Sequence, residues 1–204
     1  AAVGDATLSV VLGFTPTVGD KFTIINNDMS ESVSGTFAGL AEGSFLNVGG
    51  QLLEISYQDG NNVVLTARGT ADTLVTLDSG RLVVQDINGG TSNDTLTISS
   101  DTANNRYLVS DSNRPLTTDI AGTTQITNTV YVPFALVTGG EIQVDTLAGD
   151  DSLVIDFSMG SFSDSIVFDG GTNGDGGDSL ELWGGAFGTL TKTYTGSDQG
   201  TIDL

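Results

Sequence analysis

The chain has 204 residues, with 26 acidic side chains against 6 basic ones and with neither His nor Cys. The missing His and Cys exclude a disulfide framework, a zinc or haem site and a Ser-His or Cys-His nucleophile. A net charge of −20 is repelled by phosphate backbones and anionic membranes, and no apolar run approaches the ~18–20 residues of a spanning helix. We therefore expect no nucleic-acid binding and no membrane insertion.

The composition favours β-structure. Asp outnumbers Glu by 21 to 5, and 27 Thr and 28 Gly accompany only 3 Pro. Glu is the better helix former, whereas Asp and Gly suit turns and Thr suits a pleated surface. Strand-sized apolar runs follow one another at 8–12, 22–25, 52–57, 63–65, 74–77, 82–84, 96–98, 107–109, 130–137, 142–144, 153–157, 166–168 and 180–183. The sequence predicts an all-β protein.

Two all-β architectures fit these runs. A β-sandwich would repeat its strands every 8–12 residues or so, whereas a parallel β-helix, a solenoid, would repeat a coil of ~20–30 residues. An acidic turn followed by an apolar strand recurs at 72–74 (DTL), 94–96 (DTL), 151–153 (DSL) and 178–180 (DSL). The first and last spacings are 22 and 27 residues, and the middle one, 57, fits two longer coils. We prefer the parallel β-helix and keep the β-sandwich as the alternative.

The domain organisation is predicted to be simple. We expect one solenoid domain over 1–204, because no Pro- or Ser-rich linker divides the chain. A soft boundary is predicted near 67–72, where the segment ARGTAD interrupts the apolar pattern. Apolar runs reach almost to both ends, so the end strands are expected to meet neighbouring modules of a longer chain or copies of the same chain.

Several segments resemble a repeat module of large secreted bacterial surface proteins, such as autotransporter passengers and the repeat-rich extracellular proteins of planctomycetes and cyanobacteria. They are 18–25 (VGDKFTII), 35–40 (GTFAGL), 53–57 (LEISY), 62–66 (NVVLT), 93–96 (NDTL), 131–134 (YVPF) and 147–153 (LAGDDSL). The resemblance covers about two thirds of the sequence. It implies a secreted or cell-surface protein, a right-handed β-helix and a structural or adhesive role, and it carries no catalytic residues with it.

Two further segments are similar to the calcium-binding RTX repeat, Gly-Gly-x-Gly-x-Asp-x-apolar-x. The segment 89–97 (GGTSNDTLT) departs from it at Ser92, and 173–181 (NGDGGDSLE) departs at Asn173. Carboxylates and carbonyls on stacked turns supply the hard oxygen ligands that Ca²⁺ prefers. The candidate ligands are Asn93, Asp94, Asp150, Asp151, Asp169, Asn173, Asp175 and Asp178. The alternative is that Asp and Gly recur here because turns need them.

The function that we expect is that of a structural or adhesive module, self-assembling through its strand edges and stiffened by calcium. The alternative is an extracellular β-helix domain that binds or cleaves carbohydrate, with a surface polysaccharide as its partner. Catalysis is not expected, because the adjacent Asp150 and Asp151 would point to opposite faces of a strand. Trp183, Phe187 and Tyr194 could form an aromatic platform for sugar or cap one end of the core.

Overall fold

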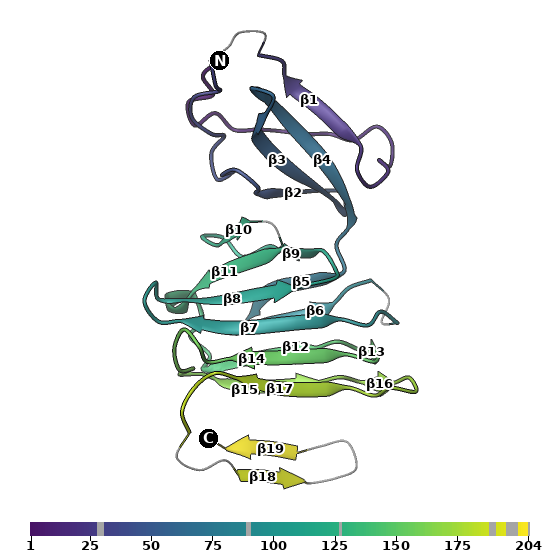
Figure 1. The fold of residues 1–204 in the computed structure, drawn as a ribbon, viewed down its shortest axis with the longest axis vertical. Coiled ribbons are helices and arrows are strands. Elements are labelled where there is room, and N and C mark those ends of the chain that lie inside the picture. The colour runs from purple at the N-terminus through teal and green to yellow at the C-terminus, as the bar shows by residue number, and fades with distance from the viewer. Residues whose placement is uncertain (28–30, 89–90, 127, 188–190, 195–199, 204) are drawn as a thin grey trace.

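The computed structural model describes residues 1–27, 31–88, 91–126, 128–187, 191–194 and 200–203, with side chains described as far as residue 187. It confirms the all-β prediction, because the described regular elements are strands apart from one 3-10 turn, η1 (Phe134–Leu136). The N-terminal sheet forms one end of an elongated molecule, and the later strands lie across the long axis in successive layers (Figure 1). Within these residues, no helix is long and apolar enough to cross a membrane.

The N-terminal unit is one antiparallel sheet in the order β1-β4-β3-β2. Its strands are β1 (Lys21–Ile25), β2 (Phe45–Val48), β3 (Gln51–Asp59) and β4 (Asn62–Thr70). Alternate residues of β3, namely Leu53, Ile55 and Tyr57, are buried, as expected for a strand with one face on a core. Gly60 and Asn61 join β3 to β4 with φ values of +63° and +69°, the two positive values of a tight hairpin turn.

The predicted strand at 8–12 is wrong. This segment joins no ladder among the described residues, although Leu8, Val10 and Leu12 pack against the N-terminal core. Their alternation therefore reflects burial of one face of an extended chain, and a strand also needs a neighbour that pairs with its backbone. The buried members of this core are Val3, Phe37, Leu53, Ile55, Tyr57, Val63, Leu65 and Ala67.

The second unit contains two larger sheets. The first has the order β15-β12-β6-β5-β9, with β5 (Thr73–Asp78), β6 (Arg81–Asp86), β9 (Leu116–Thr118), β12 (Glu141–Asp145) and β15 (Ser165–Asp169). The second has the order β10-β11-β8-β7-β14-β17, with β7 (Thr95–Asp101), β8 (Arg106–Asp111), β10 (Thr124–Ile126), β11 (Thr129–Pro133), β14 (Ser152–Asp156) and β17 (Ser179–Trp183). Two short pairs join β13 (Ala148–Gly149) to β16 (Thr172–Asn173), and β18 (Thr191–Tyr194) to β19 (Gly200–Asp203).

Part of this unit is a parallel stack. Strands β6, β12 and β15 pair in parallel in one sheet, with Val84 opposite Val144. Strands β7, β14 and β17 do the same in the other sheet, where Leu96 lies opposite Leu153 and Leu153 opposite Leu180. Three copies of the acidic turn therefore precede strands that pair in register, whereas the copy at 72–74 begins β5 in the opposite sheet. The antiparallel pairs β5–β6, β7–β8, β8–β11 and β10–β11 and the parallel pair β5–β9 complete the two sheets.

The two units have separate hydrophobic cores. The N-terminal core ends at Ala67, and the second core begins at Val75. The predicted soft boundary near 67–72 falls between them. The second core contains apolar residues of both larger sheets, namely Val75, Leu82, Val84, Leu96, Ile98, Tyr107, Val109, Leu116, Ile120, Val130, Val132, Val137, Ile142, Val144, Leu153 and Ile155.

Candidate functional site

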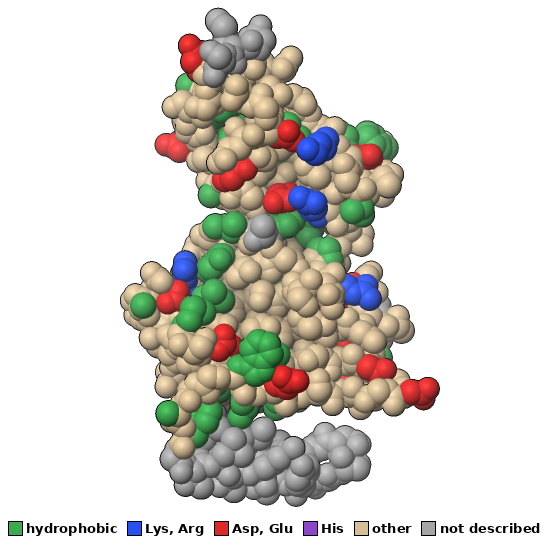
Figure 2. Space-filling view, viewed as in Figure 1, with side chains coloured by type: hydrophobic (Ala, Val, Ile, Leu, Met, Phe, Trp, Pro, Cys, Tyr) green, Lys and Arg blue, Asp and Glu red, His purple; other side chains and the backbone are tan. Residues whose placement is uncertain are grey.

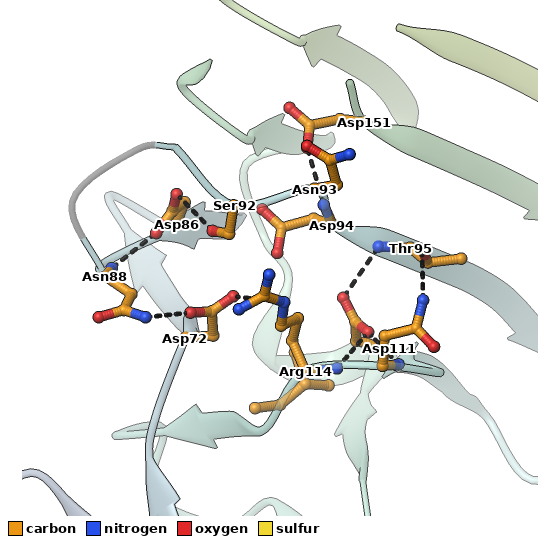
Figure 3. A network of polar contacts seen from close by, with 12 residues as sticks. Asp72, Asp86, Asn88, Ser92, Asn93, Asp94, Thr95, Asp111, Arg114 and Asp151 are labelled. Atoms are coloured by element: carbon orange, nitrogen blue, oxygen red, sulfur yellow. Dashed lines mark hydrogen bonds and ion pairs between the residues drawn. The ribbon is translucent and has the colours of Figure 1, made fainter. Parts of the chain in front are cut away.

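Four buried carboxylates meet at one end of the two larger sheets. Asp72 directly precedes β5 and Asp86 ends β6, and the antiparallel pairing of these strands places both residues at the same end. Asp94 and Asp151 directly precede β7 and β14, whose parallel pairing brings them together at the corresponding end of the other sheet. All four residues are at most 3% exposed. We call this set the carboxylate network (Figure 3).

Asn88 and Ser92 bind two of these carboxylates from the chain that follows β6. The Asn88 backbone N–H donates to Asp86 Oδ1 over 2.6 Å, and its side-chain amide donates to Asp72 Oδ1 over 2.5 Å. The Ser92 hydroxyl donates to Asp86 Oδ2 over 3.3 Å. Both oxygens of Asp86 are thus satisfied, whereas Asp72 keeps one oxygen, Oδ2, without a hydrogen bond among the described residues.

One cation lies against the network. Arg114 Nε is 3.7 Å from Asp72 Oδ2, and the Arg114 side chain is 40% exposed. The backbone N–H groups of Asn113 and Arg114 donate to Asp111 Oδ1, so the buried Asp111 carboxylate fixes the start of this loop. Because four carboxylates face a single guanidinium, the network keeps a surplus of negative charge.

Asp94 is the least satisfied member of the network. Neither of its carboxylate oxygens has a hydrogen-bond partner among the described residues, although the side chain is 1% exposed. Burial, followed by the nearby carboxylates of Asp72, Asp86 and Asp151, raises the pKa of Asp94 to about 8. Burial also raises the pKa of Asp151. Such groups are costly to bury, so each needs a compensating proton, cation or hydrogen bond.

A second set of bonds runs between the stacked turns. Asp151 Oδ1 accepts the backbone N–H of Asp94 over 2.8 Å, and Asp178 Oδ1 accepts that of Asp151 over 2.9 Å. One residue earlier in these turns, Asn93 Oδ1 accepts the N–H of Asp150 over 3.1 Å. Each turn is therefore tied to the next by a side-chain oxygen and a backbone N–H. We call this arrangement the turn ladder.

The turn ladder brings together five of the eight predicted calcium ligands, namely Asn93, Asp94, Asp150, Asp151 and Asp178. The other three are exposed, namely Asp169 at the end of β15, Asn173 at the end of β16 and Asp175 in the segment that follows β16. Gly89 and Gly90 of the first RTX-like segment lie outside the described residues. In the described part of the chain, no three acidic side chains are already grouped as a metal site. The calcium site stays a prediction.

Sequence reasoning missed Asp72 and Asp86 as members of a site. The acidic turn at 72–74 is visible in the sequence, but its copies stack along one sheet and Asp72 belongs to the other. Nothing in the spacing reports that the end of β6 folds back beside the start of β7. The sequence does show that Asp72 precedes one apolar run and that Asp86 follows the next one. This placement was the available signal that both residues lie at the same end of a hairpin.

The described cations do not form a basic surface. Lys21 pairs with Asp59, Arg68 with Glu54, Arg81 with Asp78 and Glu141, Arg106 with Asp101, and Arg114 with Asp72. The Lys192 side chain lies outside the described residues. Acidic side chains are scattered over the viewed face of both units in Figure 2.

Comparison of the chain with protein-family models, with curated proteins and with solved structures finds no match.

Proposed function

We propose that the chain is a structural module of a secreted or cell-surface bacterial protein, built around a short right-handed β-helix. The observation that carries this proposal is the in-register parallel pairing of β6-β12-β15 and β7-β14-β17. Each pass of the chain adds one strand to each sheet, and β13 and β16 pair between them. Repetition of such a coil extends a solenoid along one axis, as a stalk, fibre or surface layer requires.

The outer edges of the stack offer a means of association. Strands β15 and β17 end their sheets, so the outer edge of each pairs with no strand among the described residues. The β18–β19 hairpin follows at the same end of the molecule, and its strands pair with each other (Figure 1). An open edge presents backbone N–H and C=O groups to which another coil or another copy can add.

Sedimentation velocity over a range of concentrations tests this proposal. We expect the wild-type chain to associate as its concentration rises, and Val167→Lys on edge strand β15 to weaken association, because a charged edge opposes strand addition. Val167 is 44% exposed, and Val11→Lys at the 90%-exposed Val11 in the N-terminal unit is the matched control. A wild-type chain that stays monomeric at high concentration, with and without calcium, contradicts association through these edges.

Carbohydrate binding is the second candidate, and Trp183 favours it. The indole is 53% exposed, and its Nε1 donates to Glu181 Oε2 over 2.8 Å, so an exposed aromatic ring lies beside a carboxylate. Phe187 instead packs edge-on against Phe157, and the Tyr194 side chain lies outside the described residues. Since the chain has one Trp, its fluorescence reports on this position alone. A saturable change in emission with a polysaccharide would support binding, and no change across a panel would exclude it at Trp183.

A further inference from the structure

We propose that the carboxylate network binds one divalent cation of the calcium type, with Asp94 as the central ligand and Asp72 and Asp151 beside it. Asp72 directly precedes β5 and Asp94 directly precedes β7, and these strands belong to opposite sheets. The bound cation would therefore join the two sheets at the end of the core. The inference goes beyond the proposed function, because a cation can bind here whether or not the molecules associate. Asp94 and Asp151 are among the calcium ligands predicted from the sequence, whereas Asp72 belongs to neither RTX-like segment and joins them from the other sheet.

Unpartnered buried oxygens carry the inference. Among the described residues, both Asp94 oxygens and Asp151 Oδ2 are buried without a hydrogen bond, and Asp72 Oδ2 is buried with the Arg114 guanidinium beside it, 3.7 Å away. The buried Thr146 hydroxyl lies near the Asp151 carboxyl, where its interaction opposes the larger, burial-driven rise in the pKa of Asp151. Buried polar atoms in native proteins nearly always have a partner, and a bound ion or water is one way in which an orphaned group obtains it. These five oxygens lie on three carboxyls and a hydroxyl, and the Asp94 carboxyl is close enough to those of Asp72 and Asp151 to interact with both electrostatically.

The negative charge of the carboxylate network also favours a bound cation. Asp94 interacts with Asp72, Asp86 and Asp151, while the nearest described cation, Arg114, pairs with Asp72. A divalent cation would remove most of the excess negative charge, whereas a single proton would remove one unit. Figure 3 shows the Asp94 carboxylate directed toward the side of the network that holds Asp72 and Arg114.

The donor set selects the kind of cation. All the free groups are oxygens, and the chain has no His or Cys to favour zinc or another soft metal. Calcium accepts 6–8 oxygens in irregular geometry, whereas magnesium demands a near-ideal octahedron. The carboxylates are not already grouped as a closed metal site, so binding requires side-chain rotation. Asp94 can rotate without breaking a hydrogen bond.

Thermal unfolding with calcium and with excess chelator tests the site in the full chain. For calcium at about a hundred times its dissociation constant, we expect the midpoint to rise by about 5–10 °C. Asp94→Asn keeps the side-chain shape and removes the charge, so it should abolish this rise. Asp175→Asn, at an exposed residue of the outer turn, is the matched control and should keep the rise in full. Magnesium at the same concentration should produce a smaller rise.

The unfolding midpoints of the variants distinguish the proposed cation site from its alternatives. No midpoint change in the wild-type chain, or the same change in Asp94→Asn, overturns the inference. Loss of the rise in Asp175→Asn alone would assign calcium to the outer turn and also overturn it. If Asp94→Asn does not fold in chelator, Asp72→Asn replaces it and must show the same loss. Sedimentation of the same samples keeps the two proposals apart, because a midpoint rise in a monomer supports the cation site and contradicts only the association.

Discussion

At the scale of single residues, buried polar side chains in this protein connect parts of the chain that are far apart in sequence. Tyr107 is fully buried, and its hydroxyl donates to Asp164 Oδ2 over 2.6 Å, while its ring stacks on Phe162 with centroids 5.7 Å apart. Burial, followed by the hydrogen bond to the Asp164 carboxylate, raises the pKa of Tyr107 to about 12. The neutral phenol is therefore the form that the folded state favours.

Tyr107→Phe should lower the free energy of unfolding at neutral pH by about 1–2 kcal/mol, because Asp164 loses its donor. The wild-type advantage should shrink as pH rises from 10 toward 12. In that range Tyr107 of the unfolded chain ionises near its ordinary pKa of about 10, while Tyr107 of the folded protein stays protonated. Ionisation therefore stabilises the unfolded state, and the free energy of unfolding of the wild type falls toward that of the variant. Denaturant unfolding of both proteins at several pH values measures the gap. A difference that stays constant up to pH 12 would contradict this prediction. Tyr131→Phe is the control variant, measured under the same conditions.

Asp178 makes a corresponding prediction for the turn ladder. Asp178→Ala leaves the Asp151 N–H without its acceptor, so we expect a loss of about 1–2 kcal/mol in the free energy of unfolding. Asp175→Ala, three residues earlier in the same turn, changes an exposed side chain and should have an effect below about 0.5 kcal/mol. Equal losses in the two variants, measured by denaturant unfolding, would show that the acidic residues serve the turn and not the ladder.

At the scale of the elements, the stacked turns approach more closely than side chains permit. A Cβ atom on Gly171 would lie 1.5 Å from the carbonyl oxygen of Leu147, and one on Gly149 would lie 2.2 Å from that of Ser92. The Gly-rich turns therefore do more than reverse the chain. They allow one pass of the backbone to lie against the next, which is what the β13–β16 pairing requires.

Gly171→Ala separates this steric role from backbone strain. Gly171 has φ +71° and Gly140 has φ +69°, so Ala should be similarly strained at both, by about 1–2 kcal/mol. Gly140 has no atom within 4 Å of an added Cβ, whereas Gly171 has the Leu147 carbonyl. Gly171→Ala should therefore cost about 1–3 kcal/mol more than Gly140→Ala, since the neighbouring backbone must move. Thermal unfolding of both variants checks this, and equal midpoints would argue against close stacking.

At the scale of the whole molecule, the sequence predicted what local patterns determine. The apolar run at 52–57, which lies in β3, and the recurrence of the acidic turn before β7, β14 and β17 were visible, because apolar patterning and turn chemistry are local. The carboxylate network was not visible as a whole. Asp72 meets Asp94 only because a hairpin in one sheet folds beside a strand of the other. The strand predicted at 8–12 is wrong because no neighbouring segment pairs with its backbone, and its own residues do not report this. Pairing between distant segments is a property of the tertiary fold.

The two separate cores predict that the second unit folds without the first. The chain crosses between them near Ala71, and Asn47 Nδ2 donates to Thr117 Oγ1 over 3.2 Å at their junction. The Asp72 N–H is satisfied within the second unit by the Pro115 carbonyl over 2.8 Å, so a cut after Thr70 leaves this hydrogen bond intact. Each unit has a buried apolar cluster of its own, which is the requirement for independent folding.

A fragment of residues 71–204 should therefore keep a β-type circular dichroism spectrum and unfold cooperatively. It should also keep the calcium-dependent midpoint rise, because Asp72, Asp86, Asp94, Asp151 and Arg114 all remain. Thr117→Val in the full chain supplies the complementary test, since it removes the acceptor of the Asn47 side-chain amide at the junction and keeps the side-chain shape. We expect a small loss of stability, of about 0.5–1.5 kcal/mol. If the fragment is unfolded, the N-terminal sheet must instead form part of a single cooperative unit, and the junction must contribute far more than its hydrogen bonds indicate.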